Sequence, residues 1–327
     1  MTDFFRKLLR PLELADCFVL AYWLIVGLLQ VVAAPRIISS HGVSAFAFLL
    51  LVDVTMVAAI LMVARNLAAA PTGRRLTAKS IPIFLTFYLG FLMLPFYATA
   101  VHPRSFEMEL LWFDQAIFGM PVATFLEPYL VAGVTDFMQI CYASHYLLPF
   151  ILMGLLLKDG KDREAEWLAA AVALVVLTSF LLYIVVPARS PYVWAFAVAD
   201  SPVRFANPIP MTGVGRAIRD WLHQNETFKY DCFPSGHTQL SLTVLVASWR
   251  YHRRSFPVFL VVVSSLIFAT LYLRYHYVVD LAAGAALVWF GWRYVPRWVH
   301  LMSTRGETYA GSKAAVDFSQ EQAGDAR

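Results

Sequence analysis

Long uncharged segments constrain this chain more than any other feature of its sequence. Five segments of 19 to 22 residues contain no Asp, Glu, Lys or Arg. As a helix, each is long enough to cross the hydrocarbon core of a bilayer, which is roughly 30 Å thick. We therefore expect each to form a transmembrane helix. The five segments are Cys17–Pro35, Ser80–Val101, Phe137–Leu157, Trp167–Ala188 and Ser255–Leu273.

Three further apolar segments complete the predicted set of membrane helices. Gly42–Ala64 contains one acid, Asp53, whereas Thr238–Trp249 and Tyr277–Trp292 are shorter. Only 15% of all residues are charged, whereas a soluble domain has about a quarter. The sequence therefore predicts an all-α, polytopic integral membrane helix bundle with about eight transmembrane helices. A single transmembrane domain is expected over residues 1–300, followed by a polar, disordered cytoplasmic tail over 301–327.

The distribution of basic residues predicts how the bundle is oriented. With the N-terminus inside and eight crossings, 18 of the 26 Lys and Arg residues fall on inside segments. Membrane proteins carry such an excess on their cytoplasmic loops. Both termini are therefore expected in the cytoplasm, with the protein in a bacterial inner membrane. Because the basic residues lie at membrane borders, the formal charge of +4 does not indicate nucleic-acid binding.

Two polar motifs interrupt the apolar pattern, and each opens an apolar segment on the predicted outer side. The first is Phe233–Thr238 and the second is Arg274–Asp280. On a helix, His276 and Asp280 are four residues apart and share a face. The carboxylate can then keep one imidazole nitrogen protonated and leave the other free to act as a nucleophile. His237 can serve as the acid that protonates a leaving group.

The same region offers groups that bind phosphate. The helices that follow the two motifs both begin at the predicted outer face, where free N–H groups and the helix dipole attract anions. A glycine in the first motif would let the backbone approach a phosphate closely. The serine beside it is interpreted as a helix cap more than as a nucleophile. The predicted phosphate-binding residues are Arg189, Arg274, Ser235 and Gly236.

The paired motifs resemble those of the type 2 phosphatidic acid phosphatase superfamily, over residues 137–292. This resemblance implies that the predicted domain is catalytic. It also implies that His276 is the nucleophile, that Asp280 orients it, and that His237 is the acid–base partner. The pattern His276-Tyr277-x-x-Asp280 is most similar to the branch that contains inositol phosphorylceramide synthases and sphingomyelin synthases.

Several positions depart from the pattern of the phosphatases in that superfamily. Leu182 stands where a lysine is usual, and Ser190 separates Arg189 from the following proline. Thr270 stands where an arginine is usual, six residues before the last histidine. These departures favour the transferase-like branch, whereas Gly236 is typical of the phosphatases.

We therefore expect an integral membrane phosphotransferase that forms a phosphohistidine and moves a phospho-head group between lipids at the extracytoplasmic face. A lipid phosphatase acting on a phosphatidic-acid-like or isoprenyl phosphate is the alternative, because water can replace the lipid hydroxyl as acceptor. A membrane transporter would instead place charged residues at mid-depth on several helices. A metal site built from His237, His276 and Asp280 is a further possibility, although no metal or other cofactor is expected. The expected partners are lipid substrates and the bilayer, and the oligomeric state is left open.

The remaining polar residues are given structural roles. His145 lies mid-helix and is interpreted as a packing residue more than as a substrate contact. Cys232 is interpreted as an ordinary small residue, and three cysteines are too few for a disulfide framework. Asp114 and Glu127 are interpreted as solvated loop acids. An interfacial helix and a short surface helix are expected in two outer segments, Pro103–Leu130 and Gly215–Asn225.

Overall fold

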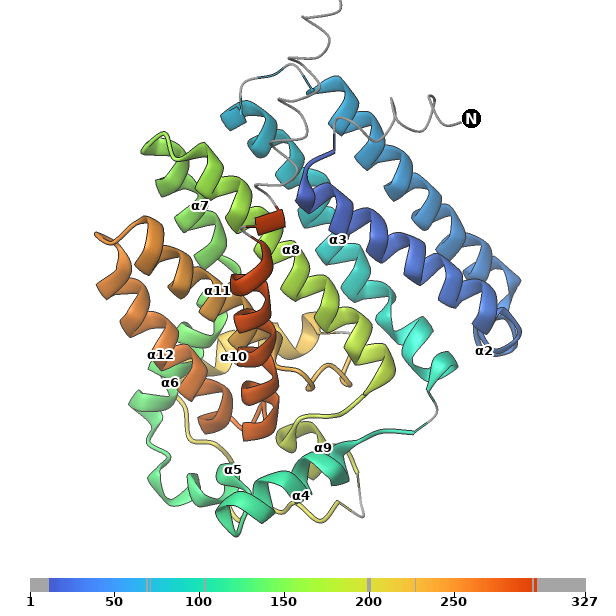
Figure 1. The fold of residues 1–327 in the computed structure, drawn as a ribbon. Coiled ribbons are helices and arrows are strands. Elements are labelled where there is room, and N and C mark those ends of the chain that lie inside the picture. The colour runs from blue at the N-terminus through green and yellow to red at the C-terminus, as the bar shows by residue number, and fades with distance from the viewer. Residues whose placement is uncertain are drawn as a thin grey trace, which may run out of the picture.

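The computed structural model describes residues 12–298 except 69, 71, 103, 199, 200, 227 and 296. Over these residues the chain forms helices and no β-sheet, apart from a single bridge between Ala188 and Asp231. The helices pack side by side as a bundle (Figure 1). The predicted all-α fold is therefore confirmed for the described residues, whereas the predicted tail over 301–327 lies outside them.

The first described helix, α2 (Leu14–Asn66), is a helical hairpin. Its 53 residues reverse direction at Gly42, which has a φ of 85°. Glycine lacks a Cβ and adopts this left-handed conformation without a steric cost. The two arms run antiparallel (Figure 1) and correspond to the first two predicted apolar segments. The next helix, α3 (Thr72–Val101), packs against α2.

A central helix, α8 (Asp162–Val185), connects this hairpin to the rest of the bundle. It is rich in alanine, whose small side chain lets neighbouring helices approach closely. It packs against α2, α3, α7 and α11. Before it, α6 (Ala132–Ala143) and α7 (Leu148–Lys158) are joined by the short turn η2 (Ser144–Tyr146) and bent by 54°. After it come α11 (Gly236–Tyr251), α12 (Phe256–Tyr272) and the last described helix, Val278–Val295.

Short helices gather at one end of the bundle. Three of them, α4 (Glu107–Phe118), α5 (Val122–Phe125) and α9 (Pro191–Ala197), lie at the bottom of Figure 1. Helix α10 (Gly213–Asn225) packs against α6, and η1 (Glu127–Tyr129) follows α5. Helices are therefore confirmed in both outer segments where the sequence predicts them. Pro191 begins α9 well because the first helical position needs no N–H donor.

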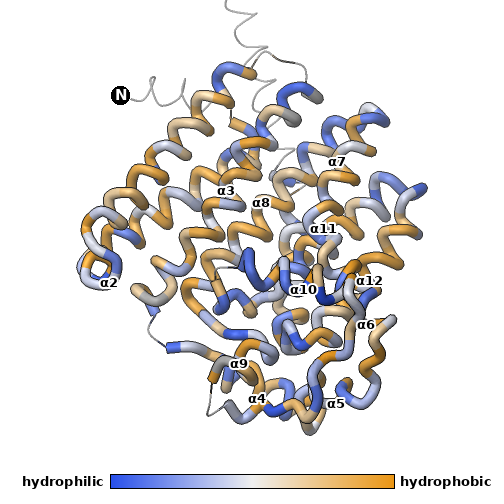
Figure 2. The backbone as a smooth tube through the Cα atoms, turned by 180° about the vertical axis from the view of Figure 1, so that it is seen from behind, coloured by the Kyte–Doolittle hydropathy of each residue, from blue (hydrophilic) through white to orange (hydrophobic). Residues whose placement is uncertain are grey.

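The surface of the bundle is suited to lipid. Large apolar side chains point outward along the long helices, and Leu24, Val54 and Val261 are each more than 60% exposed. Figure 2 shows hydrophobic residues along most of the helix lengths. Four described helices are long and apolar enough to cross a membrane, or five when the bent pair of α6 and α7 counts as one span.

The sequence predicts eight crossings, which is more than the four or five spans counted among the described helices. This prediction treats the two arms of α2 as separate spans, and it includes α11 and α12, which have only 16 and 17 residues. Both helices are shorter than the roughly 20 residues of a full span. The number of crossings and the side of each terminus therefore stay predictions.

Candidate active site

The predicted histidine–aspartate pair forms at the start of the last described helix. Nδ1 of His276 lies 3.2 Å from Oδ2 of Asp280. The helix itself begins at Val278, so the carboxylate reaches back across the first turn to the histidine that precedes the helix. The same Oδ2 accepts a hydrogen bond of 2.8 Å from the backbone N–H of Tyr277. Both side chains are buried, Asp280 completely, so the pair is held in one geometry.

Cys232 joins this pair, a contact that the sequence interpretation did not foresee. Its thiol donates to Oδ2 of Asp280 over 2.9 Å, and its Sγ lies 3.6 Å from Nδ1 of His276. Burial, followed by the charge of Asp280, raises the pKa of the Cys232 thiol well above its ordinary value. Cys232 therefore keeps its proton and acts as a hydrogen-bond donor to the carboxylate.

Ser235 connects the first motif to the second by a backbone hydrogen bond. The Ser235 hydroxyl accepts from the backbone N–H of Thr238 over 3.3 Å, which makes it the N-cap of α11 as the sequence predicts. The backbone N–H of Ser235 donates to the carbonyl of Asp280 over 3.1 Å. Because of this bond, His237 in the first turn of α11 lies near His276, with 5.8 Å between their ring centroids.

Gly236 is required by the packing of this turn. A Cβ at this position would lie 2.7 Å from the hydroxyl oxygen of Tyr183 on α8. Tyr183 is only 5% exposed, so its ring has little space into which it could move. The glycine therefore has a local steric reason, whether or not it approaches a phosphate.

Two residues of the α6–α7 bend surround His237. The ring of Tyr142 stacks on the His237 ring at 4.2 Å, and the ring of His145 lies 4.1 Å from it. Nδ1 of His145 is 2.9 Å from the carbonyl of Tyr142, which can only accept, so this nitrogen carries a proton. Among the described residues, the Nε2 of His237 is buried and has no hydrogen-bond partner. The bend thus places a second histidine beside the candidate acid, where the sequence favoured a packing role over a substrate contact.

The two predicted arginines are held by acids of the short helices. Arg189 lies over the ring of Tyr230 and donates to its hydroxyl over 2.5 Å, and its Nε lies 3.6 Å from Glu107. Arg274 is completely buried and has a left-handed φ of 66°. Its guanidinium packs 3.8 Å from the ring centre of Phe205.

Arg274 also forms polar contacts with the segment that contains Phe205. It donates to the carbonyl of Asn207 over 3.1 Å and lies 3.5 Å from Oε1 of Glu127. Glu127 in turn accepts from the backbone N–H of Asn207 over 2.6 Å. The structure thus brings together His237, His276, Asp280, Ser235 and Gly236, whereas Arg189 and Arg274 are each engaged with a carboxylate.

The interpretation of Asp114 and Glu127 as solvated loop acids was wrong. Asp114 is only 2% exposed and accepts from the backbone N–H of Val278 over 3.0 Å. Burial raises the pKa of Asp114 to about 6, although the hydrogen bond from Val278 opposes this shift. Glu127 is engaged with Arg274 and Asn207. Their partners are far away in the sequence, so no local pattern could have indicated these contacts.

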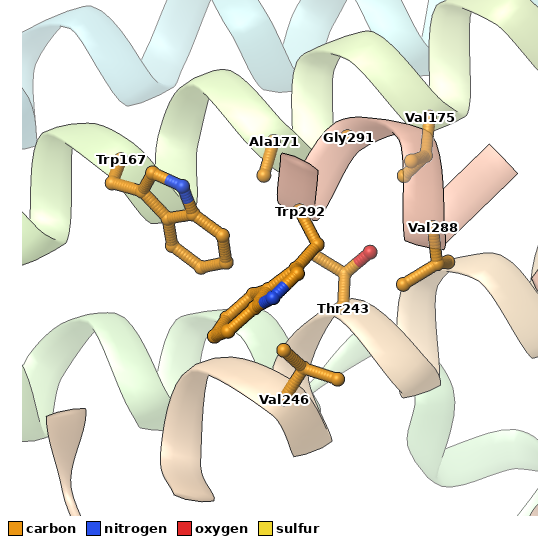
Figure 3. A pocket seen from close by; sticks show the side chains of 8 residues that line it. All are labelled: Trp167, Ala171, Val175, Thr243, Val246, Val288, Gly291 and Trp292. Carbon is orange, nitrogen blue, oxygen red and sulfur yellow. The ribbon is translucent and has the colours of Figure 1, made fainter. Parts of the chain in front are cut away.

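An apolar hollow lies elsewhere in the bundle. It is too narrow to hold a ligand, and its eight lining residues come from α8, α11 and the last described helix. Figure 3 shows Trp167 and Trp292 next to one another at this hollow, and their rings meet edge to face with centroids 5.4 Å apart. None of the lining residues is titratable, so the polar cluster around His276 is the stronger candidate for chemistry.

Comparison with known proteins agrees with this assignment. The family model described as the PAP2 superfamily matches residues 109–294, more than half of the chain. The matched region contains both motifs and both arginines, and it begins early enough to include Asp114 on α4. No curated protein and no solved structure matches the chain. Since the family model covers most of the bundle and every candidate site residue, the chain belongs to the PAP2 superfamily.

Proposed function

We propose that the chain is an integral membrane lipid phosphotransferase that acts through a phosphohistidine on His276. Membership of the PAP2 superfamily supports a lipid phosphatase or phosphotransferase type of activity. The observation that carries the proposal is the buried contact of 3.2 Å between His276 and Asp280, with the ring of His237 5.8 Å from that of His276. These are the groups that a two-step displacement at phosphorus needs.

Before the first step, Oδ2 of Asp280 accepts a hydrogen bond from Nδ1–H of His276, so the Nδ1 proton stays on the ring and the lone pair is on Nε2. Nε2 attacks the phosphorus of a donor lipid, and the bond between phosphorus and the donor-lipid oxygen breaks. Protonated His237 gives its proton to that oxygen, and the donor leaves as an alcohol. In the second step, a lipid hydroxyl gives its proton to His237 and attacks the phosphorus, and the bond to His276 breaks.

Cys232 and Tyr277 have positioning roles in this scheme. Their S–H and N–H groups donate to the same carboxylate oxygen that holds His276. Three donors on one oxygen fix the carboxylate and therefore the imidazole plane. Positioning of this kind matters because phosphoryl transfer depends mainly on orientation and electrostatics.

The burial of the site favours a lipid hydroxyl over water as the acceptor. Only 4% of His276 is exposed, and Phe205 packs over Arg274, which lies two residues before it in the sequence. Exclusion of water protects a reactive intermediate from hydrolysis. Gly236, typical of the phosphatases, does not speak against a transferase here because the hydroxyl of Tyr183 already requires a glycine.

The alternative is a lipid phosphatase with the same first step. In that case water takes the place of the lipid hydroxyl, and the substrate is a phosphatidic-acid-like or isoprenyl phosphate. A transporter is less well supported, because the titratable residues of the two motifs converge on one end of α11 and of the last described helix rather than at mid-depth.

Product analysis with purified protein tests the proposal. Phospholipid labelled in its phosphate is incubated with and without ceramide or diacylglycerol, and His276→Ala protein serves as the control. We expect a new labelled phospholipid that depends on the added lipid alcohol and on His276. Rapid release of free phosphate, without a new phospholipid from any lipid alcohol, would leave the phosphatase. Denatured, trapped enzyme should carry label that is lost in acid and retained in base.

A further inference from the structure

Three side chains at the candidate site form a set of metal ligands of mixed chemistry. The sulfur of Cys232, Nδ1 of His276 and Oδ2 of Asp280 all lie within 4.8 Å of one another. The separate distances are 3.6 Å from sulfur to nitrogen, 3.2 Å from nitrogen to oxygen and 2.9 Å from sulfur to oxygen. Among the described residues, His237 is not part of this set, so it differs from the metal site considered from sequence.

These distances are close to those that a tetrahedral metal site needs. Zn²⁺ binds sulfur, nitrogen and oxygen ligands at about 2.0–2.3 Å, which places neighbouring ligands about 3.3–3.8 Å apart. Two of the three observed distances lie within 0.1 Å of that range. The third, between sulfur and oxygen, would lengthen when the metal replaces the proton they share.

We propose that Zn²⁺ binds Cys232, His276 and Asp280 and inhibits the enzyme. The proposal that Zn²⁺ binds depends only on the geometry of these three side chains, whereas the proposal that Zn²⁺ inhibits rests on the proposed function. Zn²⁺ would displace the thiol proton, which passes to solvent, and the Nδ1 proton, which moves to Nε2, so that His276 binds the metal as a neutral imidazole. The thiolate and the carboxylate then balance the two positive charges of the ion, which lowers the cost of burying it. A water or a phosphate oxygen completes the fourth position.

Inhibition follows from what the metal takes from His276. The imidazole loses its hydrogen bond to Asp280, and while Nδ1 binds the metal the ring proton is on Nε2, so Nε2 has no lone pair with which to attack phosphorus. The thiolate selects borderline-soft ions such as Zn²⁺, because Mg²⁺ and Ca²⁺ require mainly oxygen ligands. We therefore expect Mg²⁺ to have no effect at concentrations at which Zn²⁺ inhibits.

Cobalt spectroscopy tests the proposed binding without any assay of turnover. Purified full-length protein is titrated with Co²⁺, whose bond to a thiolate gives a charge-transfer band in the near ultraviolet. We expect one Co²⁺ per chain, displacement by Zn²⁺ but not by Mg²⁺, and release of one proton per ion. Cys232→Ser should lose the band. Cys141→Ser is the matched control and should retain it, because Cys141 is also buried but interacts with Ser265 instead.

Inhibition by Zn²⁺ is measured in parallel, with each variant compared with its own rate without metal. Cys232→Ala should need more than about 10-fold more Zn²⁺ for half-inhibition than the unaltered protein. No cobalt–thiolate band in the unaltered protein, or a band that survives Cys232→Ser, would overturn the binding site. Equal inhibition of the unaltered and Cys232→Ala proteins would overturn the inhibitory role, as would activity that is lost on chelation and restored by Zn²⁺. If no phosphotransfer is found, the cobalt titration still decides the metal site.

Discussion

Replacing Gly236 with alanine separates two reasons for the glycine in the first motif. The added Cβ would lie 2.7 Å from the Tyr183 hydroxyl oxygen, whereas comfortable carbon contacts are about 3.5–4.0 Å. Overpacking of a buried site lowers the free energy of unfolding by roughly 1–3 kcal/mol. If this strain displaces the first turn of α11 and His237 with it, turnover should fall about 10- to 100-fold, since 1.4 kcal/mol corresponds to about tenfold.

The second substitution, Tyr183→Phe, removes the atom that the new methyl group would meet. Alone, Tyr183→Phe should lower the free energy of unfolding by about 0.5–1.5 kcal/mol, because a buried hydroxyl interaction is lost. Combined with Gly236→Ala, it should restore turnover to within a few-fold of the Tyr183→Phe protein. Initial rates on labelled lipid and the melting temperature in detergent are measured for the three variants. A double variant as impaired as Gly236→Ala alone would refute the steric explanation and indicate that phosphate itself needs the glycine.

Three further predictions concern the nucleophile, a buried acid and the topology. His276→Ala should lower turnover by at least about 10³-fold while the elution profile in size-exclusion chromatography stays unchanged; retained turnover would contradict its role as nucleophile. Asp114 has a pKa raised from 3.8 to about 6 in the folded protein, so its ionisation disfavours folding and stability is lost as the pH rises from about 4 to 6. Asp114→Asn should therefore stabilise the protein by about 1–3 kcal/mol at pH 7 and by much less at pH 4, and equal melting-temperature shifts at both pH values would contradict this cause. A cysteine at the exposed Pro202 should react with an impermeant thiol reagent on intact cells, and one at the exposed Arg254 should not; the reverse pattern, corrected for labelling of the unaltered protein, would invert the topology.

Local features of the site could be predicted from sequence, and long-range contacts could not. The pairing of His276 with Asp280 follows from a separation of four residues, and the cap at Ser235 follows from the residue type before an apolar helix. Cys232 lies 48 residues from Asp280, and Asp114 lies 164 residues from Val278. No periodicity encodes such separations, so the sequence alone indicated only an ordinary small residue at Cys232 and a solvated loop acid at Asp114.

The helical architecture was also predictable, because it too follows from local features of the sequence. Uncharged segments with the length of a bilayer predict helices directly, and Gly42 marks the reversal in α2. The depth of each helix was not predictable, because shorter helices such as α11 are held by neighbours rather than by their own length. The bend between α6 and α7 also leaves no clear signal in the sequence, yet it brings His145 to His237.

Three N–H groups at the start of the two helices that carry the candidate site already have acceptors from within the protein. Thr238 donates to Ser235, Tyr277 to Asp280 and Val278 to Asp114. A phosphate that bound these N–H groups would have to displace the side-chain oxygens that already accept from them. Only the difference in free energy between the new hydrogen bonds and the broken ones would therefore contribute to phosphate affinity. We therefore expect free inorganic phosphate to compete weakly for the site. The greater part of substrate affinity should come from the acyl chains that remain in the bilayer.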